Sequence, residues 1–338
     1  MRAFQVDQAW SMDNVKIATR TIPTPGSGQV RLKMSAAALN YRDLIIPMRA
    51  YGRRMQDLPL ILLSDGVGIV DAIGAGASGV ALGDRVCPIF YQTWLAGEPN
   101  NETMLSSLGC EQDGTMAEYM VVPAEGVCHV PSHLTDFEAA TLPTAAVTAW
   151  RSLMTEGRLK AGEKVLVQGT GGVSLFALQF AKSLGAHVII TSSSDKKLAR
   201  AKEMGADETI NYIKNPQWGR LVKELTSGAG VDHVIEVGGA TTLEQSLRAV
   251  RTGGTISMIG VLSGSDPKIP LGQVVTRHVR LQGITVGSRE DFESMVAHIA
   301  NRKIRPVVDK IFPFEALRSA MEYLASGEHF GKICIRHV

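Results

Sequence analysis

The sequence predicts an α/β protein in which a doubly wound parallel sheet follows an all-β, barrel-like region. The first observation is the segment 164–207, where a short apolar run, closely spaced glycines, a helical apolar pattern and a β-branched run succeed one another. The second is the alternation of strand and helix patterns that continues to residue 286 and gives about six strands. The third is the segment 1–123, where short β-like runs alternate with glycine turns.

Within the β-rich region, several elements can be placed. Residues 29–38 read as a strand, and the apolar run 60–63 reads as a second, buried one. Residues 92–110 are polar and weakly patterned, which indicates a loop. A helical pattern covers 137–155, and Pro143 should break or kink it because proline cannot continue a regular helix.

The second half of the chain continues the strand and helix alternation. The expected strands are 187–191, 208–210, 231–237, 255–261, 279–286 and, at the end, 332–335; the expected helices are 216–226, 243–251, 291–301 and 314–325.

Composition excludes several classes of protein. At 338 residues, with 45% hydrophobic and 20% charged residues, the chain has an ordinary globular balance and room for two domains. A net charge of +2 without a block of like charges leaves no basic tract for nucleic acid. No apolar stretch approaches the roughly 18 residues of a membrane span, and no signal region is expected. The scattered cysteines indicate buried, reduced thiols of a cytoplasmic protein; they are Cys87, Cys110, Cys128 and Cys334.

The glycine-rich turn at the start of the second half is a candidate phosphate-binding loop. Gly169, Gly171 and Gly172 lie between the apolar run and the helix that begins near Val173. Without side chains there, backbone N–H groups can approach the pyrophosphate of a dinucleotide at the helix N-terminus. Ser174 takes the place of the third glycine of the fingerprint. A tight turn in another kind of α/β protein is the alternative interpretation.

Further motifs resemble those of the medium-chain dehydrogenase/reductase superfamily, and the resemblance covers nearly the whole chain. The motifs are GDRV at 83–86, GTMAEY at 114–119 and LPTAAVTAW at 142–150, followed by the glycine-rich segment in the expected order. The resemblance implies a GroES-like β-barrel catalytic domain at 1–145, completed by 287–338. It also implies a Rossmann NADP-binding domain at 146–286.

Zinc-dependent members of this superfamily hold catalytic zinc at places that can be located by their flanking residues. Here those places hold Asn40, the pair Ser64-Asp65, and Thr144. None supplies the thiolate or imidazole that zinc prefers, and a single carboxylate cannot hold the ion. The closely spaced cysteines of a structural zinc lobe are also missing. We therefore expect no metal, and the chain resembles the zinc-independent branch, which includes NADPH:quinone oxidoreductases and related alkene reductases.

The end of the second predicted strand of the parallel sheet indicates the cofactor. NAD enzymes place Asp or Glu there to bind the ribose hydroxyls, whereas this chain has Ser192. A carboxylate would repel a 2′-phosphate, but Ser192, Ser193 and Lys197 can donate to it. Lys197 and Tyr212 match the lysine and tyrosine that bind this phosphate in bacterial quinone oxidoreductases. We expect NADP rather than NAD; the alternative is that the cations of this helix form only a solvated face.

The resemblance also implies the remaining cofactor contacts. Thr148 would line the nicotinamide pocket, and backbone at the ends of successive strands would hold the ribose and the carboxamide. These strand-end residues are Val237, Gly238, Gly260, Val261, Leu262, Val286 and Gly287.

Without a metal, hydride transfer must rely on positioning and on hydrogen bonds to the developing negative charge. The candidate catalytic donors are Asn40, Tyr41, Arg42 and Tyr51. Asn40 and Tyr51 match an asparagine and a pocket tyrosine of the family. Arg42 departs from the small apolar residue usual in quinone oxidoreductases. It could bind an anionic substrate or pair with Asp43 or Asp65, and the pairing is the favoured interpretation.

These observations predict a zinc-independent, NADPH-dependent oxidoreductase that transfers hydride to a quinone or an α,β-unsaturated carbonyl. An alcohol dehydrogenase or aldehyde reductase is the second hypothesis. A non-catalytic NADPH-binding protein, as some lens crystallins of this superfamily are, is the third. Residues 279–286 should form the edge strand of the parallel sheet, and the resemblance implies a homodimer joined there, or a homotetramer of such dimers.

Overall fold

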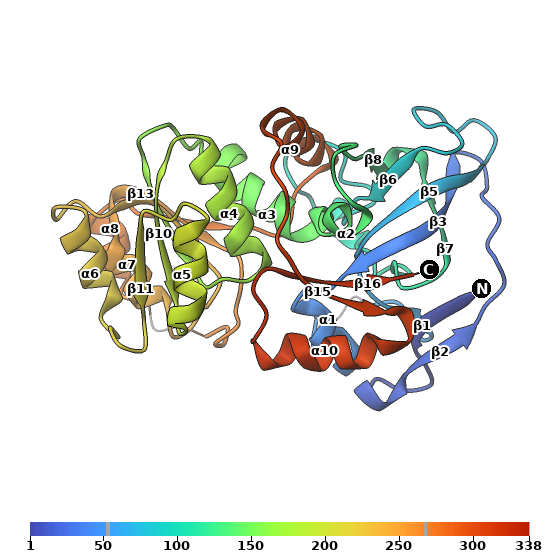
Figure 1. The fold of residues 1–338 in the computed structure, drawn as a ribbon, viewed down its shortest axis with the longest axis horizontal. Coiled ribbons are helices and arrows are strands. Elements are labelled where there is room, and N and C mark those ends of the chain that lie inside the picture. The colour runs from blue at the N-terminus through green and yellow to red at the C-terminus, as the bar shows by residue number, and fades with distance from the viewer. Residues whose placement is uncertain (52–54, 267–268, 338) are drawn as a thin grey trace. The chain divides into compact units, whose positions relative to one another are not determined.

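The computed structural model describes residues 1–51, 55–266 and 269–337 of the chain (Figure 1). The chain divides into two compact units. Met1–Val147 together with Val286–Val338 form the first unit, and Thr148–Thr285 form the second. Among the described residues, no helix is both long enough and apolar enough to cross a bilayer.

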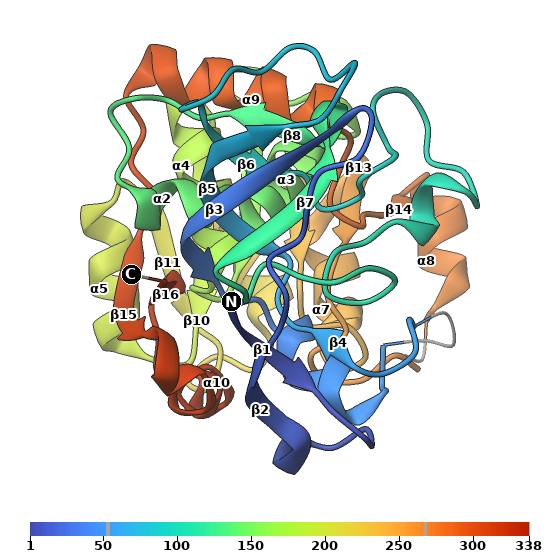
Figure 2. The ribbon, with the colours of Figure 1, turned by 90° about the vertical axis from the view of Figure 1, so that its right-hand side faces the viewer.

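A largely antiparallel sheet is the framework of the first unit (Figure 2). Its strands are β3 (Gln29–Ala38), β5 (Asp65–Ile73), β6 (Arg85–Pro88), β7 (Tyr119–Pro123), β8 (Val127–His129), β15 (Val308–Pro313) and β16 (Lys332–Arg336). Their order is β15-β16-β3-β5-β6-β8, and β7 also pairs with β3. A smaller sheet has the order β2-β1-β4, from β1 (Arg2–Val6), β2 (Val15–Thr19) and β4 (Leu60–Ile61).

The two-residue period of a strand explains how β3 is buried. Val30, Leu32 and Met34 alternate with more exposed residues and enter one core cluster with Val70 and Val86 of the neighbouring strands. The last three residues of β3 are buried on both faces, where β16 and β5 flank the strand. The end of β3 is therefore held in place by its two neighbouring strands, and so is the start of the polar turn that follows it.

Helices of the first unit are α1 (Arg42–Ile45), α2 (Asp136–Ala140), α9 (Arg289–Arg302) and α10 (Leu317–Ser326). The single helix expected at 137–155 is interrupted. After α2, Leu142–Ala146 is π-helical, α3 (Val147–Trp150) follows, and Arg151–Thr155 is π-helical again. Pro143 accounts for the first interruption, because it lacks an N–H and its ring displaces the carbonyl four residues earlier.

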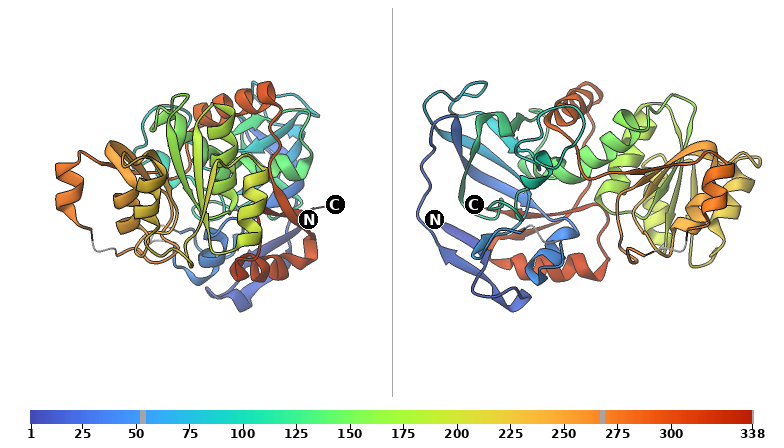
Figure 3. Two further views of the ribbon diagram at one scale, coloured as in Figure 1. Left: turned by 60° about the vertical axis from the view of Figure 1, so that its left-hand side comes forward. Right: turned by 180° about the vertical axis from the view of Figure 1, so that it is seen from behind.

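The second unit is the expected doubly wound parallel sheet (Figure 3). Its strands are β9 (Lys164–Gln168), β10 (His187–Ser192), β11 (Glu208–Asn211), β12 (Val231–Glu236), β13 (Val250–Met258) and β14 (Arg280–Gly283). All neighbouring pairs are parallel, in the order β11-β10-β9-β12-β13-β14. The strand order reverses between β9 and β12, and such a switch point is where open α/β sheets bind ligands.

The connecting helices of this unit are α4 (Gly172–Ser183), α5 (Asp195–Glu203), α6 (Trp218–Leu225), α7 (Leu243–Ala249) and α8 (Leu271–Thr276). Right-handed crossovers put α4 and α5 on one face of the sheet and α6, α7 and α8 on the other. Because helices cover both faces of the sheet, the central strand β9 is buried on both sides. Its residues Val165, Leu166 and Val167 are all buried, as is typical of a central parallel strand.

We propose that β14 pairs with its counterpart in a second chain and forms a homodimer. In the described chain β14 pairs only with β13, and an open strand edge invites pairing. Leu271 and Val275 of α8 are 66% and 72% exposed, which adds uncovered apolar surface to this unit. Ile284 N–H donates to Met258 O at 2.9 Å, so by the two-residue period the N–H of Leu281 faces the open edge.

Leu281→Pro removes that outward N–H and should convert the dimer to a monomer in light scattering at micromolar concentration. Leu281→Ala loses the same side chain but keeps the N–H, and it should remain dimeric. A wild-type chain that is monomeric at this concentration would refute the proposal.

Candidate active site

The turn after β3 carries Asn40, the first candidate donor. Its N–H donates to Asp43 Oδ2 at 2.7 Å, and the Asp43 N–H donates back to Asn40 O at 3.0 Å. This reciprocal pair closes the turn into α1. Burial raises the pKa of the Asp43 carboxyl to about 6. Leu39 N–H donates to Ile333 O at 3.0 Å, which ties the turn to β16.

Three neighbouring strands bring distant polar residues to this turn. The sheet register pairs Ala38 of β3 with Asp65 of β5 on one side and with Cys334 of β16 on the other. Lys332, the first residue of β16, therefore reaches both Asn40 and Asp65. The contact joins residues that are 267 positions apart in the chain.

The ammonium of Lys332 is buried in this cluster, with its side chain only 4% exposed. Nζ donates to Asn40 Oδ1 at 2.6 Å and to the main-chain carbonyl before it at 2.6 Å, and lies 3.4 Å from Asp65 Oδ2. The fully buried Asp65 carboxylate also accepts hydrogen bonds from the hydroxyls of Ser64 and Thr144. Each ion thus has a counter-ion and hydrogen bonds, which offset the cost of its desolvation.

These residues do not fit a zinc ion. The places at which zinc-dependent members carry ligands here hold an amide and two hydroxyls, from Asn40, Ser64 and Thr144. The one carboxylate, Asp65, already faces the ammonium of Lys332. A divalent cation would meet that resident positive charge and would find no thiolate or imidazole. In the ranges that the structure describes, no group of three His, Cys, Asp or Glu side chains is arranged to hold a metal.

The side-chain amide of Asn40 is satisfied on one side only. Because an ammonium can only donate, Oδ1 must face Lys332, and this assigns the orientation of the amide. Nδ2 is buried and has no hydrogen-bond partner among the described residues. Buried donors without a partner are rare in folded proteins, so Nδ2 is the candidate donor to a substrate oxygen.

Arg42 does not form the ion pair that was the favoured interpretation of the sequence. Arg42 is 6% exposed, and its guanidinium donates to Leu108 O at 2.8 Å and to Ser107 Oγ at 3.2 Å. Within the described part of the chain no ion-pair contact joins it to Asp43 or Asp65, although its charge opposes the rise in the pKa of the Asp43 carboxyl that burial causes. The physical reason is that residues 107 and 108, in the loop predicted at 92–110, fold over α1 and supply neutral acceptors.

Two aromatic rings also hold Arg42. Its Cζ lies 4.6 Å from the ring centre of Tyr51 and 4.6 Å from that of Phe90, an arrangement in which a planar cation is stabilised by both π faces. The structure thus brings the candidates Arg42 and Tyr51 together. Tyr41, at the start of α1, is 48% exposed and lies at the surface of the unit.

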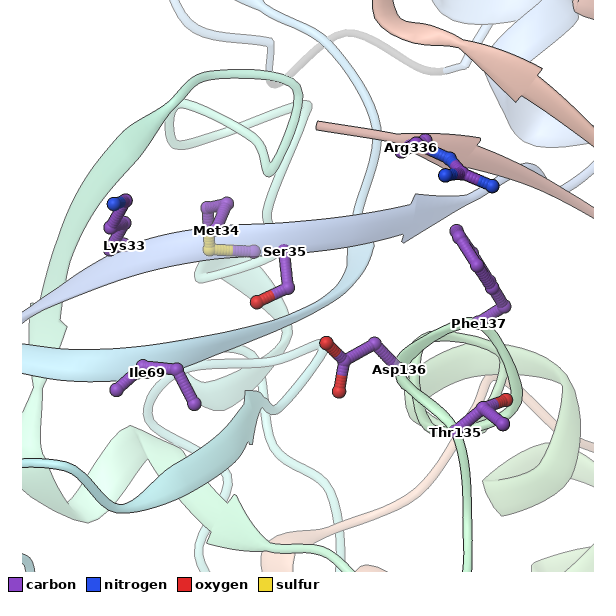
Figure 4. A pocket seen from close by; sticks show the side chains of 8 residues that line it. All are labelled: Lys33, Met34, Ser35, Ile69, Thr135, Asp136, Phe137 and Arg336. Carbon is purple, nitrogen blue, oxygen red and sulfur yellow. The ribbon is translucent and has the colours of Figure 1, made fainter. Parts of the chain in front are cut away.

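A surface cavity of about 490 Å³ lies further along the same strands (Figure 4). Its lining residues are Lys33, Met34, Ser35, Ile69, Thr135, Asp136, Phe137 and Arg336. Asp136 forms an ion pair with Arg85 at 3.0 Å, and the guanidinium of Arg336 lies 5.3 Å from the Phe137 ring centre. These charged groups are already engaged, and none of the predicted site residues contributes to the cavity.

In the second unit, the glycine loop leaves an open cradle at the start of α4. Gly171 precedes the helix without a side-chain cap, and no acidic residue lies in the first turn. The space beside Gly171 is open, because a Cβ there would meet no atom within 4 Å. Gly169 has φ = +71°, a backbone conformation that favours glycine. The N–H groups between these glycines and Val173 are therefore open to a phosphate, and a dinucleotide fits this cradle.

A buried carboxylate organises the neighbouring loop. Glu236 ends β12, and its Oε1 accepts from the N–H groups of Gly238 at 2.8 Å and Gly239 at 3.0 Å. Its Oε2 accepts from Gln168 Nε2 at 2.6 Å and from the Ser246 hydroxyl. Because Gln168 ends β9, this carboxylate links the two strands of the switch point. Nothing in the sequence indicates this role for Glu236, because the strand 231–237 also contains Asp232 and His233 and no local pattern marks one of the three as buried at a strand end.

The segments that follow β12 and β13 pack closely, backbone against backbone. Gly239 has φ = +92°, and a Cβ there would lie 2.7 Å from a carbonyl oxygen. A Cβ at Gly260 would lie 2.2 Å from Val237 O, so this position also requires glycine. Val261 and Leu262 follow and are exposed. The expected strand-end cofactor residues 237–238 and 260–262 therefore lie side by side.

The residues expected at the adenosine phosphate meet where β10 and β11 end. Tyr212 N–H donates to Ser192 O at 3.2 Å, which brings these two residues together. The Ser192 hydroxyl is buried and accepts from the N–H of Ser194, while Ser193 is exposed. Lys197 lies in the first turn of α5, whose N-cap is Ser194.

Asp195 is a further charged residue in this turn, and no sequence motif indicates its role. Its carboxylate accepts from Lys214 Nζ at 2.5 Å and from Asn211 Nδ2 at 2.7 Å. The hydrogen bond from Lys214 lowers the pKa of Asp195. Lys214 thus balances a negative charge that would otherwise oppose a 2′-phosphate.

The last expected cofactor residues belong to different units. Thr148 is the first residue of the second unit, is buried, and accepts a hydrogen bond from the Ser152 hydroxyl on its carbonyl at 2.7 Å. Val286, with φ = +59°, and Gly287 begin the returning segment of the first unit. A Cβ at Gly287 would lie 2.7 Å from Val147 Cγ1 and 2.8 Å from Asp291 Oδ2, so a larger residue there would have to displace these side chains.

Comparison with known proteins finds two family models that match the chain, one in its N-terminal half and one in its C-terminal half. The alcohol dehydrogenase GroES-like domain matches residues 26–132, and the zinc-binding dehydrogenase domain matches residues 172–301. A zinc-type alcohol dehydrogenase-like protein of Schizosaccharomyces pombe is 45% identical over 98% of this chain and 97% of its own. The chain belongs to the medium-chain dehydrogenase/reductase superfamily. It is an oxidoreductase of that superfamily, as its relatives and structural neighbours are.

Solved members of the superfamily have the same fold with different activities. An NAD-dependent alcohol dehydrogenase is 34% identical with a TM-score of 0.91 over the whole of both chains. A mycobacterial quinone oxidoreductase is 27% identical with a TM-score of 0.83, again over both chains. A related mycobacterial structure, 27% identical with a TM-score of 0.84 over both chains, contains NADPH. An acryloyl-coenzyme A reductase of Metallosphaera sedula is 30% identical over 93% of each chain.

Removal of the Glu236 carboxylate should destabilise the second unit. Glu236→Ala leaves two backbone N–H groups and the Gln168 amide without their acceptor, which should cost about 3 kcal/mol of unfolding free energy. Urea denaturation measures this loss. Glu244→Ala removes an exposed carboxylate paired with Arg248 and should change the free energy by less than about 0.5 kcal/mol. Equal effects of the two substitutions would contradict the role given to Glu236.

Proposed function

We propose that this oxidoreductase is a zinc-independent, NADPH-dependent reductase that transfers hydride to a quinone or an α,β-unsaturated carbonyl compound. The observation that carries the proposal is the cluster of Asn40, Asp65 and Lys332, where a buried ammonium lies beside the residues at the zinc-ligand places. Relatives named acryloyl-coenzyme A reductase and quinone oxidoreductase support it.

The side chains of this cluster suit such a substrate. When bound, the cofactor supplies the hydride, and the protein has to stabilise the negative charge that develops on the substrate oxygen. Asn40 Nδ2 is an unused donor for that oxygen, and Tyr51, held by Arg42, is a second candidate. An enolate or phenolate spreads its charge over several atoms, so neutral donors can stabilise it. The localised alkoxide from a simple ketone has more need of a metal or a positioned acid.

The second candidate function is oxidation of simple alcohols or reduction of aldehydes. It is favoured by the relatives and structures named alcohol dehydrogenase. NADPH binding without turnover is a third outcome, which the same assays would reveal.

We expect the purified protein to oxidise NADPH in the presence of quinones or enones, with well under one equivalent of zinc per chain. A chelator should leave the rate unchanged, because Asn40, Ser64 and Thr144 offer zinc neither thiolate nor imidazole. Elemental analysis and a spectrophotometric substrate panel test both points. One tightly held zinc per chain with chelator-sensitive turnover would overturn the proposal, and turnover of simple alcohols alone would favour the second function.

The cofactor part of the proposal rests on Ser192, Ser193, Lys197 and Tyr212. Ser192 and Tyr212 lie together at the ends of β10 and β11, and no carboxylate replaces Ser192 at the ribose position. Lys214 balances the charge of Asp195 nearby. The mycobacterial structure with bound NADPH supports this preference, and the NAD-dependent alcohol dehydrogenase shows that the fold also serves NAD.

We expect NADPH to bind more tightly than NADH by roughly a hundredfold, or nearer tenfold if solvent screens the site, since each charge-assisted bond contributes about 1.5–3 kcal/mol. Ser192→Asp should reverse the preference, because its carboxylate repels the phosphate and accepts from the ribose hydroxyls of NADH. Lys197→Ala should weaken NADPH alone, whereas the control Lys196→Ala, exposed on the same helix, should change neither. Dissociation constants at fixed salt decide this; equal binding of both cofactors by the wild type would refute it.

A further inference from the structure

We propose that Lys332 is a positioning residue that fixes and polarises the amide of Asn40, so that Asn40 Nδ2 donates to the carbonyl oxygen of the substrate. Lys332 lies at the start of β16, far from Asn40 in the chain, and no sequence motif singles it out. The identity of the ligand as a carbonyl compound rests on the proposed function. The orientation of the amide rests on the geometry of this cluster.

A buried lysine is uncommon, because burial of an ammonium is costly unless all its donors are used. Here the side chain of Lys332 is 4% exposed, and three acceptors surround Nζ. They are Leu39 O and Asn40 Oδ1, each at 2.6 Å, and Asp65 Oδ2 at 3.4 Å. The three donors of the ammonium therefore match three acceptors, and none is left for a substrate.

The ammonium determines which way the Asn40 amide points. Asn40 Oδ1 must accept from Nζ, and an exchange of the amide oxygen and nitrogen would place two donors against each other. The Asn40 backbone is held independently, by its N–H bond to Asp43 Oδ2 at 2.7 Å. With both the backbone and Oδ1 fixed, Nδ2 has one direction, and it is buried there without a partner among the described residues.

The positive charge also makes Nδ2 a better donor. A cation that binds the oxygen of an amide draws electron density away from its nitrogen, and hydrogen bonds in such a chain strengthen one another. Asn40 Oδ1 and Leu39 O, each 2.6 Å from Nζ, are closer to the ammonium than Asp65 Oδ2 at 3.4 Å, so the amide oxygen is one of its two nearest acceptors. Asp65 in turn is shared with the hydroxyls of Ser64 and Thr144. A positive charge thus acts on the substrate oxygen through Asn40, without a metal ion.

A set of variants separates this role from a structural one. Asn40→Asp keeps an acceptor for Lys332 but loses the Nδ2 donor, and it should lower kcat by about a hundredfold, as loss of one oxyanion donor does. Lys332→Met should lower kcat by about ten- to a hundredfold, and Lys332→Arg should restore part of the loss. NADPH affinity should be unchanged in all three. Lys33→Met, the same substitution at an exposed site on β3, should behave as the wild type.

The deciding measurement is a double-mutant cycle on kcat with the best quinone or enone of the panel. Because Lys332 acts through Asn40, Lys332→Met should cause less than a threefold further loss in an Asn40→Ala background. Folding of each variant is measured by urea denaturation, and Lys332→Arg serves in the cycle if Lys332→Met does not fold. Multiplicative losses, or a Lys332→Met enzyme with wild-type kcat per folded chain, would overturn the inference and leave the proposed function standing. A wild type that reduces none of the panel would overturn both.

Discussion

The buried ion pair of Lys332 and Asp65 is the constraint on which the first unit depends. Each ion is buried, and the other ion together with the surrounding hydrogen-bond partners offsets the cost of its desolvation. Their contact requires β16, β3 and β5 to be neighbours in one fixed register, since a shift by one residue would turn these side chains to the other face. The segment that returns to the first unit after residue 286 therefore completes its site as well as its sheet.

A similar arrangement organises the second unit. Glu236 is buried at the end of β12 and is surrounded by donors from the backbone, a glutamine and hydroxyls. In the first unit the buried charges are the first residues of β16 and β5, and in the second unit Glu236 is the last residue of β12, so in both units a buried charge lies where a strand meets a loop. Hydrogen bonds around such a charge hold a loop without large side chains of its own, which leaves room for a ligand. This explains how glycine-rich loops can keep a defined shape in the second unit.

The two clusters also divide the chemistry that we propose. The second unit presents open N–H groups and a serine-rich strand end to the cofactor. In the proposed mechanism the first unit presents an amide whose oxygen is bound to an ammonium, at the place where zinc-dependent members of the superfamily carry their metal. In that arrangement the protein's own positive charge stabilises negative charge on the substrate. A delocalised anion requires less such stabilisation than a localised alkoxide.

The sequence by itself determined the parallel sheet, its glycine loop and the superfamily, because these depend on local periodicity and short motifs. It also indicated the residues at the ligand places of Asn40, Ser64-Asp65 and Thr144. The interpretation of Arg42 as an ion-pair partner was wrong, because its actual acceptors come from a loop whose path no local pattern predicts. Lys332 and Glu236 were missed for the same reason. Whether a charged residue is buried, and against which partner, is decided by strand register between distant segments, and only the tertiary structure sets that register.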